Sequence, residues 1–224
     1  LFEYTKMFNL LQHFKPDFKN TVLIGAGGYS YPKYFQKKYP DKILDVVEID
    51  PGFTELSKQY LNFEESERVR IVHKDGRIFL NKTEHTYDTM IIDAFPSHFA
   101  IPFHLTTQEA VKNIYRILSD DGVVMVNIIS SISGDRSKFL QAEYRTYKDI
   151  FPHVLLFQVR QINPEAAQNI LLVALKSPET PSFENSDKTM QSYLELLWKD
   201  SYNPTLPPLT DNFAPVEKYI EYLY

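Results

Sequence analysis

"VLIGAGGYSYPKYF", residues 22–35, joins a strand-forming run to a glycine-rich turn and then to a partly helical segment. The chain has only 7 glycines, and Gly25, Gly27 and Gly28 fall within four positions of this stretch. Glycine adopts positive φ without strain and lets a ligand approach the backbone. Open α/β sheets bind ligands at such turns, outside the carboxyl ends of their strands. We therefore predict a ligand site at this turn.

Strand and helix patterns alternate along the chain that surrounds this turn. Strands are expected at 21–27, 43–50, 68–75, 87–95 and 122–129, and helices at 31–38, 51–61, 76–81, 106–118 and 136–150. This alternation predicts a mostly parallel α/β sheet with helices on both faces. Two more apolar runs, 153–159 and 169–176, leave no room for a helix between them, so they predict an antiparallel hairpin that completes a seven-stranded sheet.

The 224 residues are expected to form one domain with short additions at each end. An apolar segment with helical spacing predicts an N-terminal helix within 1–18, and residues 19–176 form the expected ligand-binding domain. Residues 177–224 are turn-rich and proline-rich, and they are expected to pack on the same domain. Within them, helices are predicted at 187–199 and from about residue 216.

Composition excludes several classes of protein. A net charge of −5 and a pI of about 5.7 argue against a general nucleic-acid binder. The chain has no cysteine, which excludes disulfides, thiol nucleophiles and cysteine zinc sites and favours a cytoplasmic location. No apolar run has the roughly 18 to 20 residues that a membrane helix needs. A chain that starts at Leu1 is expected to be a fragment.

Carboxylates follow the strands at the positions that a nucleoside site requires. Glu48 lies 23 residues after Gly25, close to the roughly 20 expected for an acid that accepts hydrogen bonds from a ribose diol. The alternative for Glu48 is a solvated strand end. Asp50 and Pro51 have a separate explanation, because Asp suits the N-cap and Pro the first position of a helix.

NAD and S-adenosyl compounds fit these observations equally well, and three further features favour the second. Asp75 and Gly76 follow the third strand, where a carboxylate can accept a hydrogen bond from an adenine amino group. Asp93 ends the fourth strand and faces the same crevice. The terminal hairpin is typical of S-adenosylmethionine-dependent transferases, and Ser30 stands where a dinucleotide fingerprint has its third glycine. Asp75 could instead serve only as a cap or turn residue.

The chain resembles the spermidine synthase (polyamine aminopropyltransferase) family. In order over residues 20 to about 176, the resemblance is carried by "VLIGAGGYS", "DVVEIDPGFTELSKQYL", "RVRIVHKDGRIFL", "YDTMIIDAF" and "IPFHLTTQEAVKNIYRILSDDGVVMVNI". It implies the Rossmann-like class I methyltransferase fold and S-adenosylmethionine, or its decarboxylated form, as co-substrate. The subgroup that it resembles most has longer members with a membrane portion before this domain, and a homodimer is expected.

The resemblance also implies roles for the residues of the glycine turn and of the strand ends. Glu48 would hold the ribose, Asp75 with Gly76 would hold the adenine, and Gly25 and Gly27 would shape the pocket. The family's "first" catalytic aspartate, which orients and deprotonates the attacking amine, corresponds to Asp93.

Two further residues are expected near the acceptor amine. The apolar loop "AFPSHFAIPFHL" is predicted to be a lid that closes over the ligand, with His104 lining the pocket. Asp211, in the stretch "LTDNFAPVEKY", also resembles the subgroup and is expected at the substrate or lid. His98, His104 and Asp93 have no standard metal-ligand spacing, so no metal is predicted.

Three departures from the family pattern concern the substrate. The glycine loop of the family has an aspartate where Gly28 stands, and its second loop aspartate corresponds to Pro96. The small N-terminal β domain that covers the polyamine in the family is not in this sequence. We expect an enzyme that transfers an aminopropyl group to an amine. A methyltransferase and a nucleoside-binding module without turnover are the alternatives.

Overall fold

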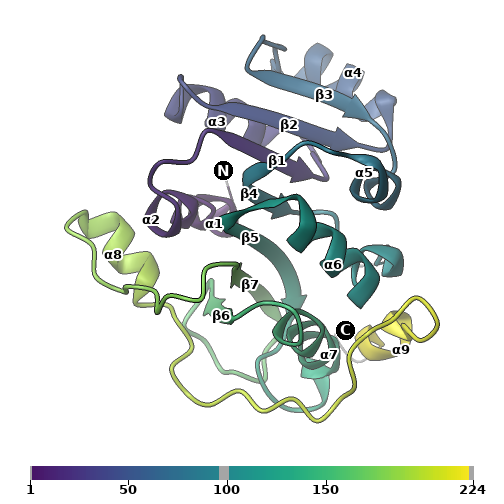
Figure 1. The fold of residues 1–224 in the computed structure, drawn as a ribbon, viewed down its shortest axis with the longest axis vertical. Coiled ribbons are helices and arrows are strands. Elements are labelled where there is room, and N and C mark those ends of the chain that lie inside the picture. The colour runs from purple at the N-terminus through teal and green to yellow at the C-terminus, as the bar shows by residue number, and fades with distance from the viewer. Residues whose placement is uncertain (1, 96–100, 222–224) are drawn as a thin grey trace.

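A computed structural model describes residues 2–95 and 101–221 and contains one seven-stranded sheet in the order β3-β2-β1-β4-β5-β7-β6 (Figure 1). The strands are β1 (Asn20–Ile24), β2 (Ile43–Glu48), β3 (Val69–His73), β4 (Tyr87–Ile92), β5 (Leu118–Ser130), β6 (His153–Gln158) and β7 (Gln168–Leu175). The first five strands pair in parallel, whereas β7 pairs antiparallel with both β5 and β6. The predicted fold class, with its terminal antiparallel hairpin, is confirmed.

Helices cover both faces of the sheet, as predicted. They are α1 (Glu3–Met7), α2 (Leu10–Phe14), α3 (Ser30–Lys38), α4 (Pro51–Leu61), α5 (Gly76–Lys82), α6 (Gln108–Ile117), α7 (Lys138–Lys148), α8 (Lys188–Leu194) and α9 (Val216–Ile220). Two 3-10 turns, Phe103–Leu105 and Asp135–Ser137, precede α6 and α7. The predicted cap at α4 is confirmed, because the Asp50 side chain accepts a hydrogen bond from the Gly52 N–H at 2.8 Å.

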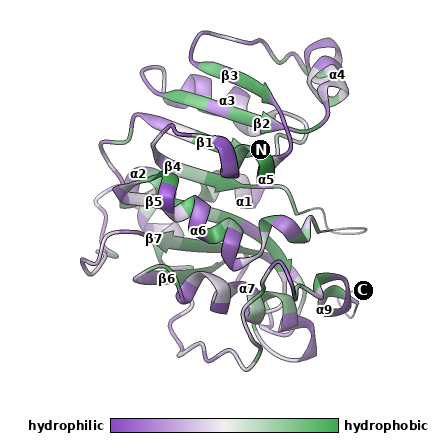
Figure 2. Ribbon diagram, turned by 45° about the vertical axis from the view of Figure 1, so that its right-hand side comes forward, coloured by the Kyte–Doolittle hydropathy of each residue, from purple (hydrophilic) through white to green (hydrophobic). Residues whose placement is uncertain are grey.

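The sheet divides the apolar core into two layers. Successive strand residues point to opposite faces, so Val22 and Ile24 pack with α5, α6, α7 and α9, whereas Leu23 packs with α1, α2, α3 and α8. Figure 2 shows the strands as largely hydrophobic ribbons between helices with hydrophilic outer faces. Burial on both faces explains why the central strands are nearly continuous apolar runs.

Two predicted helices differ from the structure. The N-terminal segment forms two short helices instead of one, because the Asn9 side-chain amide donates to the Lys6 carbonyl at 2.9 Å and competes with the next helical hydrogen bond. The helix predicted at 187–199 ends at Leu194. The following residues pair with β6 instead, since the Trp198 N–H donates to the Leu156 carbonyl at 2.8 Å.

The C-terminal extension runs back across the domain from α8 to α9. The Leu209 N–H donates to the Thr146 hydroxyl on α7 at 2.9 Å, and Val216 and Tyr219 of α9 belong to the same apolar layer as α7. Within the described ranges, no helix is long and apolar enough to cross a membrane.

Candidate active site

A cavity of about 610 Å³ opens at the carboxyl ends of the parallel strands. It lies where β1 and β4 adjoin and the chain crosses from one half of the sheet to the other, which is the ligand site of open α/β sheets. Seven of the eight predicted site residues line it: Gly25, Gly27, Glu48, Asp75, Gly76, Asp93 and His104. The topology therefore brings together residues from position 25 to position 104 of the sequence.

Gly25 and Gly27 favour glycine for different physical reasons. Gly25 has φ +89°, and a Cβ atom there would lie 2.6 Å from the carbonyl oxygen of Asp93, so β1 and β4 can approach only without a side chain. Gly27 has φ +49°, and a Cβ there would meet nothing within 4 Å. The space beside Gly27 is open to a ligand.

Glu48 ties the glycine turn to the end of β2. Its Oε2 accepts a hydrogen bond from the Ala26 N–H at 3.0 Å, and its Oε1 accepts one from the Asp50 N–H at 3.0 Å. The side chain is buried and still borders the cavity. Glu48 is therefore more than a solvated strand end, because it holds the loop in shape beside the cavity.

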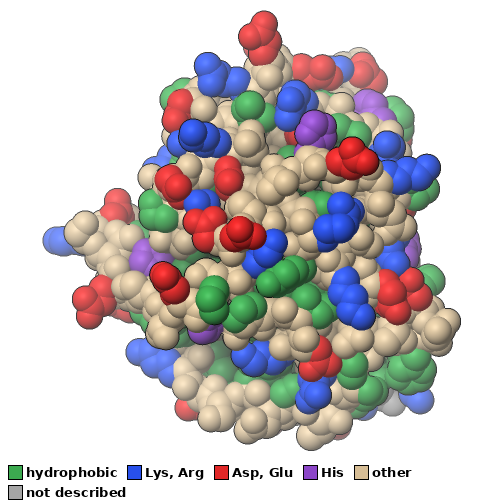
Figure 3. Space-filling model, in the orientation of Figure 1, with side chains coloured by type: hydrophobic (Ala, Val, Ile, Leu, Met, Phe, Trp, Pro, Cys, Tyr) green, Lys and Arg blue, Asp and Glu red, His purple; other side chains and the backbone are tan. Residues whose placement is uncertain are grey.

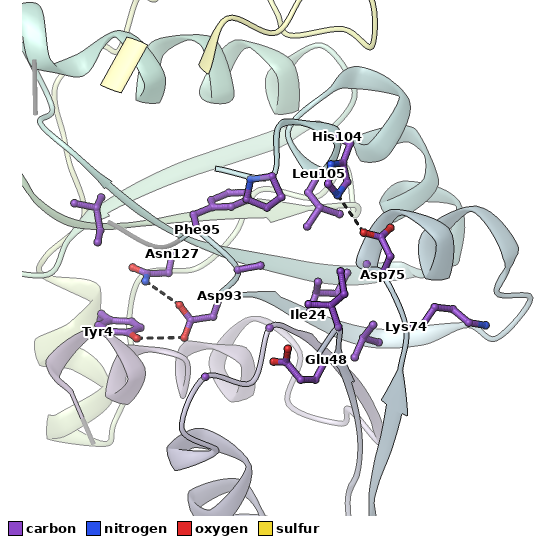
Figure 4. Close-up of a pocket in the computed structure, with 18 of the residues that line it drawn as sticks. Tyr4, Ile24, Glu48, Lys74, Asp75, Asp93, Phe95, His104, Leu105 and Asn127 are labelled. Atoms are coloured by element: carbon purple, nitrogen blue, oxygen red, sulfur yellow. Dashed lines mark hydrogen bonds and ion pairs between the residues drawn. The ribbon is translucent and has the colours of Figure 1, made fainter. Parts of the chain in front are cut away.

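Asp75 both caps a helix and borders the cavity. Its Oδ1 accepts a hydrogen bond from the Ile78 N–H at 2.9 Å and caps α5, and its Oδ2 lies 3.3 Å from His104 Nε2 (Figure 4). The adjacent Gly76 has no room for a side chain, since a Cβ there would lie 2.8 Å from Ile24 Cγ2. The pair Asp75–His104 joins the end of β3 to the loop that precedes α6.

Asp93 lies in a hydrogen-bond network that crosses the floor of the cavity. Its Oδ2 accepts from the Tyr4 hydroxyl at 3.2 Å, and its Oδ1 accepts from the Asn127 amide at 2.9 Å (Figure 4). Asn127 in turn accepts from the Asn169 amide at 3.0 Å. Burial raises the pKa of the Asp93 carboxyl, and the hydrogen bonds from Asn127 and Tyr4 partly offset that rise. A half-buried carboxylate with a raised pKa suits general-base chemistry.

Sequence reasoning did not find Tyr4, Asn127 or Asn169. Tyr4 lies in an amphipathic segment in which an aromatic residue is expected to pack in the core. In the structure its hydroxyl reaches Asp93 from α1. The signal for Asn127 is an amide inside the apolar run "VVMVNII", and buried amides need partners. Lys74 also lines the cavity.

Asp211 lies outside the cavity lining. It accepts two hydrogen bonds from Arg77 at 2.7 and 3.1 Å, and Arg77 also donates to the His104 carbonyl at 2.7 Å. Thr107 adds a hydrogen bond to Asp211 at 2.6 Å. Asp211 is therefore placed to support the backbone that carries His104, rather than to touch a ligand in the cavity.

Part of the predicted lid, including Pro96 and His98, lies outside the described residues. The rest of that loop lines the cavity with Ala94, Phe95, Pro102 and Leu105. Among residues 2–95 and 101–221, no group of three or more His, Asp or Glu side chains is placed to hold a metal ion.

Comparison with known proteins identifies the family. The model of the spermine/spermidine synthase domain matches residues 5–186. The chain belongs to the spermine/spermidine synthase family. A polyamine aminopropyltransferase of Vibrio vulnificus is 29% identical over 198 residues, which cover 87% of this chain and 63% of the relative. The human eEF1A lysine and N-terminal methyltransferase is 25% identical over 81% of this chain and 27% of its own length. This member of the family thus spans less than two thirds of either relative.

Solved structures show the same fold. A probable spermidine synthase from Corynebacterium glutamicum superimposes with a TM-score of 0.71 at 22% identity, covering 86% of this chain and 69% of that one. Human methyltransferase-like protein 13 in complex with SAH gives 0.70 at 21% identity, covering 87% and 91%. A spermidine synthase in complex with the transition-state analogue AdoDATO gives 0.71 at 18% identity, covering 98% and 75%.

Proposed function

We propose that this protein transfers an aminopropyl group from decarboxylated S-adenosylmethionine to an amine. The observation that carries the proposal is the position of Asp93, a carboxylate with a raised pKa beside an open glycine turn. Membership of the spermine/spermidine synthase family and the AdoDATO-bound structural neighbour support the choice of donor.

In this proposal the nucleoside occupies the donor end of the cavity, which comprises Gly25, Gly27, Glu48, Asp75 and Gly76. Glu48 keeps lone pairs for the ribose diol while it holds the turn, and Asp75 accepts from the adenine amino group. The open space beside Gly27 admits the nucleoside close to the backbone.

The reaction is a displacement at a carbon attached to a sulfonium sulfur. The leaving thioether is neutral, so the site needs no acid for it. It must align the amine nitrogen, the carbon and the sulfur, and it must remove a proton from the amine. Asp93 takes that proton, and the hydrogen bonds from Tyr4 and Asn127 hold its two oxygens in place.

Methyl transfer is the second candidate, and Gly28 favours it. An aminopropyl donor carries an ammonium group that a carboxylate in the glycine loop could hold, but residues 25–38 include no Asp or Glu. The human relative is itself named a methyltransferase. A nucleoside-binding role without turnover is the remaining alternative.

Product analysis tests these candidates together. Purified protein is incubated with a mixture of small amines and with either donor, and the nucleoside product is measured by chromatography. We expect methylthioadenosine from the decarboxylated donor. S-adenosylhomocysteine from S-adenosylmethionine, without methylthioadenosine, would show methyl transfer. Nucleoside binding without either product would show a binding module.

Three further expectations belong to this proposal. An amine rather than a nucleic acid is the partner, and Figure 3 shows acidic and basic side chains interspersed on the face in view. A homodimer is expected from the resemblance, and a cytoplasmic location from the absence of cysteine. Analytical ultracentrifugation tests the homodimer. Fractionation of cells that produce the natural full-length protein tests the cytoplasmic location.

A further inference from the structure

The cavity has few carboxylates for a polyamine substrate. Among the described residues that line it, Glu48, Asp75 and Asp93 are the acidic ones. The apolar loop cannot add another, because residues 94–108 contain no Asp or Glu. Since a desolvated ammonium group needs an anionic or hydrogen-bonding partner, the distribution of these three carboxylates limits which amines the cavity accepts.

Two of the three carboxylates belong to the donor end. Glu48 accepts the Ala26 and Asp50 N–H groups, and Asp75 caps α5 and contacts His104. In Figure 4, Asp93 and Asn127 lie on one side of the view and Asp75 on the other, with Glu48 between them. Among the described residues that line the cavity, Asp93 is the carboxylate that remains for a cationic acceptor.

The surfaces around Asp93 are aromatic, apolar or amide. The Phe2 and Tyr4 rings stack at 5.9 Å with an interplanar angle of 9°, and Phe2 is 68% exposed at the cavity. Phe95 adds a third aromatic ring, and Ile129 an apolar side chain. We call this region the acceptor end; it comprises Phe2, Tyr4, Asp93, Phe95, Asn127, Ile129 and Asn169.

We infer that the acceptor of this enzyme has one amine, which binds at Asp93, and an uncharged aromatic or apolar body, which packs on Phe2 and Tyr4. The inference rests on the proposed function and specifies its substrate class. The amine nitrogen forms a bond to the transferred carbon while the carbon–sulfur bond breaks, and the electron pair leaves with sulfur. The amine proton passes to Asp93. Among the described lining residues, a second ammonium on the acceptor would meet aromatic rings and amides and no carboxylate beyond Asp93.

The test compares amines that differ in one feature. Calorimetry on protein saturated with methylthioadenosine measures binding of butylamine, 1,4-diaminobutane and 2-phenylethylamine. We expect diaminobutane to bind within about threefold of butylamine, because its second charge gains no ion pair. Phenylethylamine should bind about tenfold more tightly than butylamine, because its ring stacks on Phe2 and Tyr4.

Diaminobutane that binds more than about tenfold tighter than butylamine would overturn the inference, since a gain of that size exceeds what exposed aromatic rings give an ammonium group and indicates a second acidic group. Failure of all three amines to bind would overturn it as well. Both results leave the proposed function standing if the decarboxylated donor still yields methylthioadenosine with another acceptor. A protein that binds no nucleoside overturns the proposed function itself, and the inference with it.

A designed carboxylate sharpens the test. Phe2→Glu places an acid beside Tyr4 and should tighten diaminobutane binding by about tenfold while weakening phenylethylamine binding. Phe213→Glu is the matched control, because Phe213 is also exposed, at 52%, and lies outside the cavity lining. The control should change neither affinity. A Phe2→Glu protein with the same preferences as the original would contradict the placement of the acceptor body on Phe2.

Discussion

The donor end and the acceptor end of the cavity are built in different ways. The donor end comes from three consecutive strand–turn units, β1, β2 and β3, and each residue there lies at the end of its own strand or within three residues after it. The acceptor end joins α1, β4, β5 and β7, so that Tyr4, Asp93, Asn127 and Asn169 converge from sites up to 165 residues apart. The donor end is local in sequence, and the acceptor end is not.

This difference separates positions of this chain that tolerate little change from positions that can change freely. At Gly25 a Cβ atom would lie 2.6 Å from the carbonyl oxygen of Asp93, so this turn tolerates little change. Side chains such as Phe2, which is largely exposed, can change without disturbing the sheet. We therefore expect the donor end to set the cofactor class and the acceptor end to set the substrate.

The largest expected effect is on turnover, and it distinguishes a role of Asp93 in the reaction from a role in nucleoside binding. Asp93→Asn should lower turnover by about 10²–10⁴-fold, because the amide cannot accept the amine proton. Nucleoside affinity should change by less than about 1 kcal/mol, because the donor end is untouched. Steady-state kinetics and calorimetry measure the two effects.

Asp120→Asn, at a fully exposed position of β5, is the control for Asp93→Asn, and both variants should melt close to the original temperature. A folded Asp93→Asn protein with full activity would remove Asp93 from the chemistry. It would also make the acceptor end a binding surface only.

The next effect concerns the donor end. Glu48→Gln should weaken methylthioadenosine binding by about 1 to 3 kcal/mol, since it removes a charged acceptor that also holds the Ala26 and Asp50 N–H groups. Calorimetry measures the loss. Glu55→Gln on the outside of α4, with a side chain 70% exposed, should have no effect. Unchanged affinity in Glu48→Gln would mean that the nucleoside does not lie at the donor end.

The next prediction concerns protein stability and the α7 side chains that pack behind the acceptor end. Phe95 packs edge-to-face on Phe139 of α7 at 6.0 Å, and Glu143 follows Phe139 by about one turn. Neither Glu143 carboxylate oxygen has a hydrogen-bond partner within the described structure. Burial raises the pKa of Glu143 well above its ordinary value. Because the folded pKa exceeds the unfolded value of about 4.3, the folded state binds this proton more tightly and loses stability as pH rises above that value.

Glu143→Gln should remove this loss. Between pH 5 and pH 8 the original protein should lose about 1 to 3 kcal/mol of unfolding free energy more than the variant does. Urea denaturation at the two pH values measures the difference. Glu179→Gln, at an exposed position, should behave like the original protein. Parallel pH profiles for the original and Glu143→Gln would show that Glu143 is paired or hydrated in solution.

The smallest effect is a shift in pH dependence. The Tyr4 hydroxyl stabilises the Asp93 carboxylate and lowers its pKa, so Tyr4→Phe should raise that pKa further. A base acts only when deprotonated, and the acidic limb of the kcat/KM profile should therefore move to higher pH, by about half a unit. Tyr60→Phe, on the exposed face of α4, should leave the profile unchanged. A shift to lower pH would contradict the direction of this hydrogen bond.

Local patterns in the sequence were sufficient for most of the fold and for the donor end. Apolar runs with a period of two or 3.6 predicted the strands and most helices, and the glycine turn and the strand-end acids predicted Gly25, Glu48, Asp75 and Asp93. These features depend on residues close together in the chain, where backbone sterics and capping act directly. The helix predicted to reach Lys199 failed, because pairing with β6 outweighs the helical preference of that segment.

The sequence by itself therefore determined the sheet, the glycine turn and the acids that follow the strands. Only the tertiary structure decided that Tyr4 and Asn127 hold Asp93, that Asp211 supports the His104 loop through Arg77, and that Asp93 lines the same cavity as Glu48 and Asp75. Hydrogen bonds between side chains 34 to 134 residues apart depend on which strands become neighbours. The order of the strands is set when the whole sheet buries both of its faces, so no local sequence pattern predicts it.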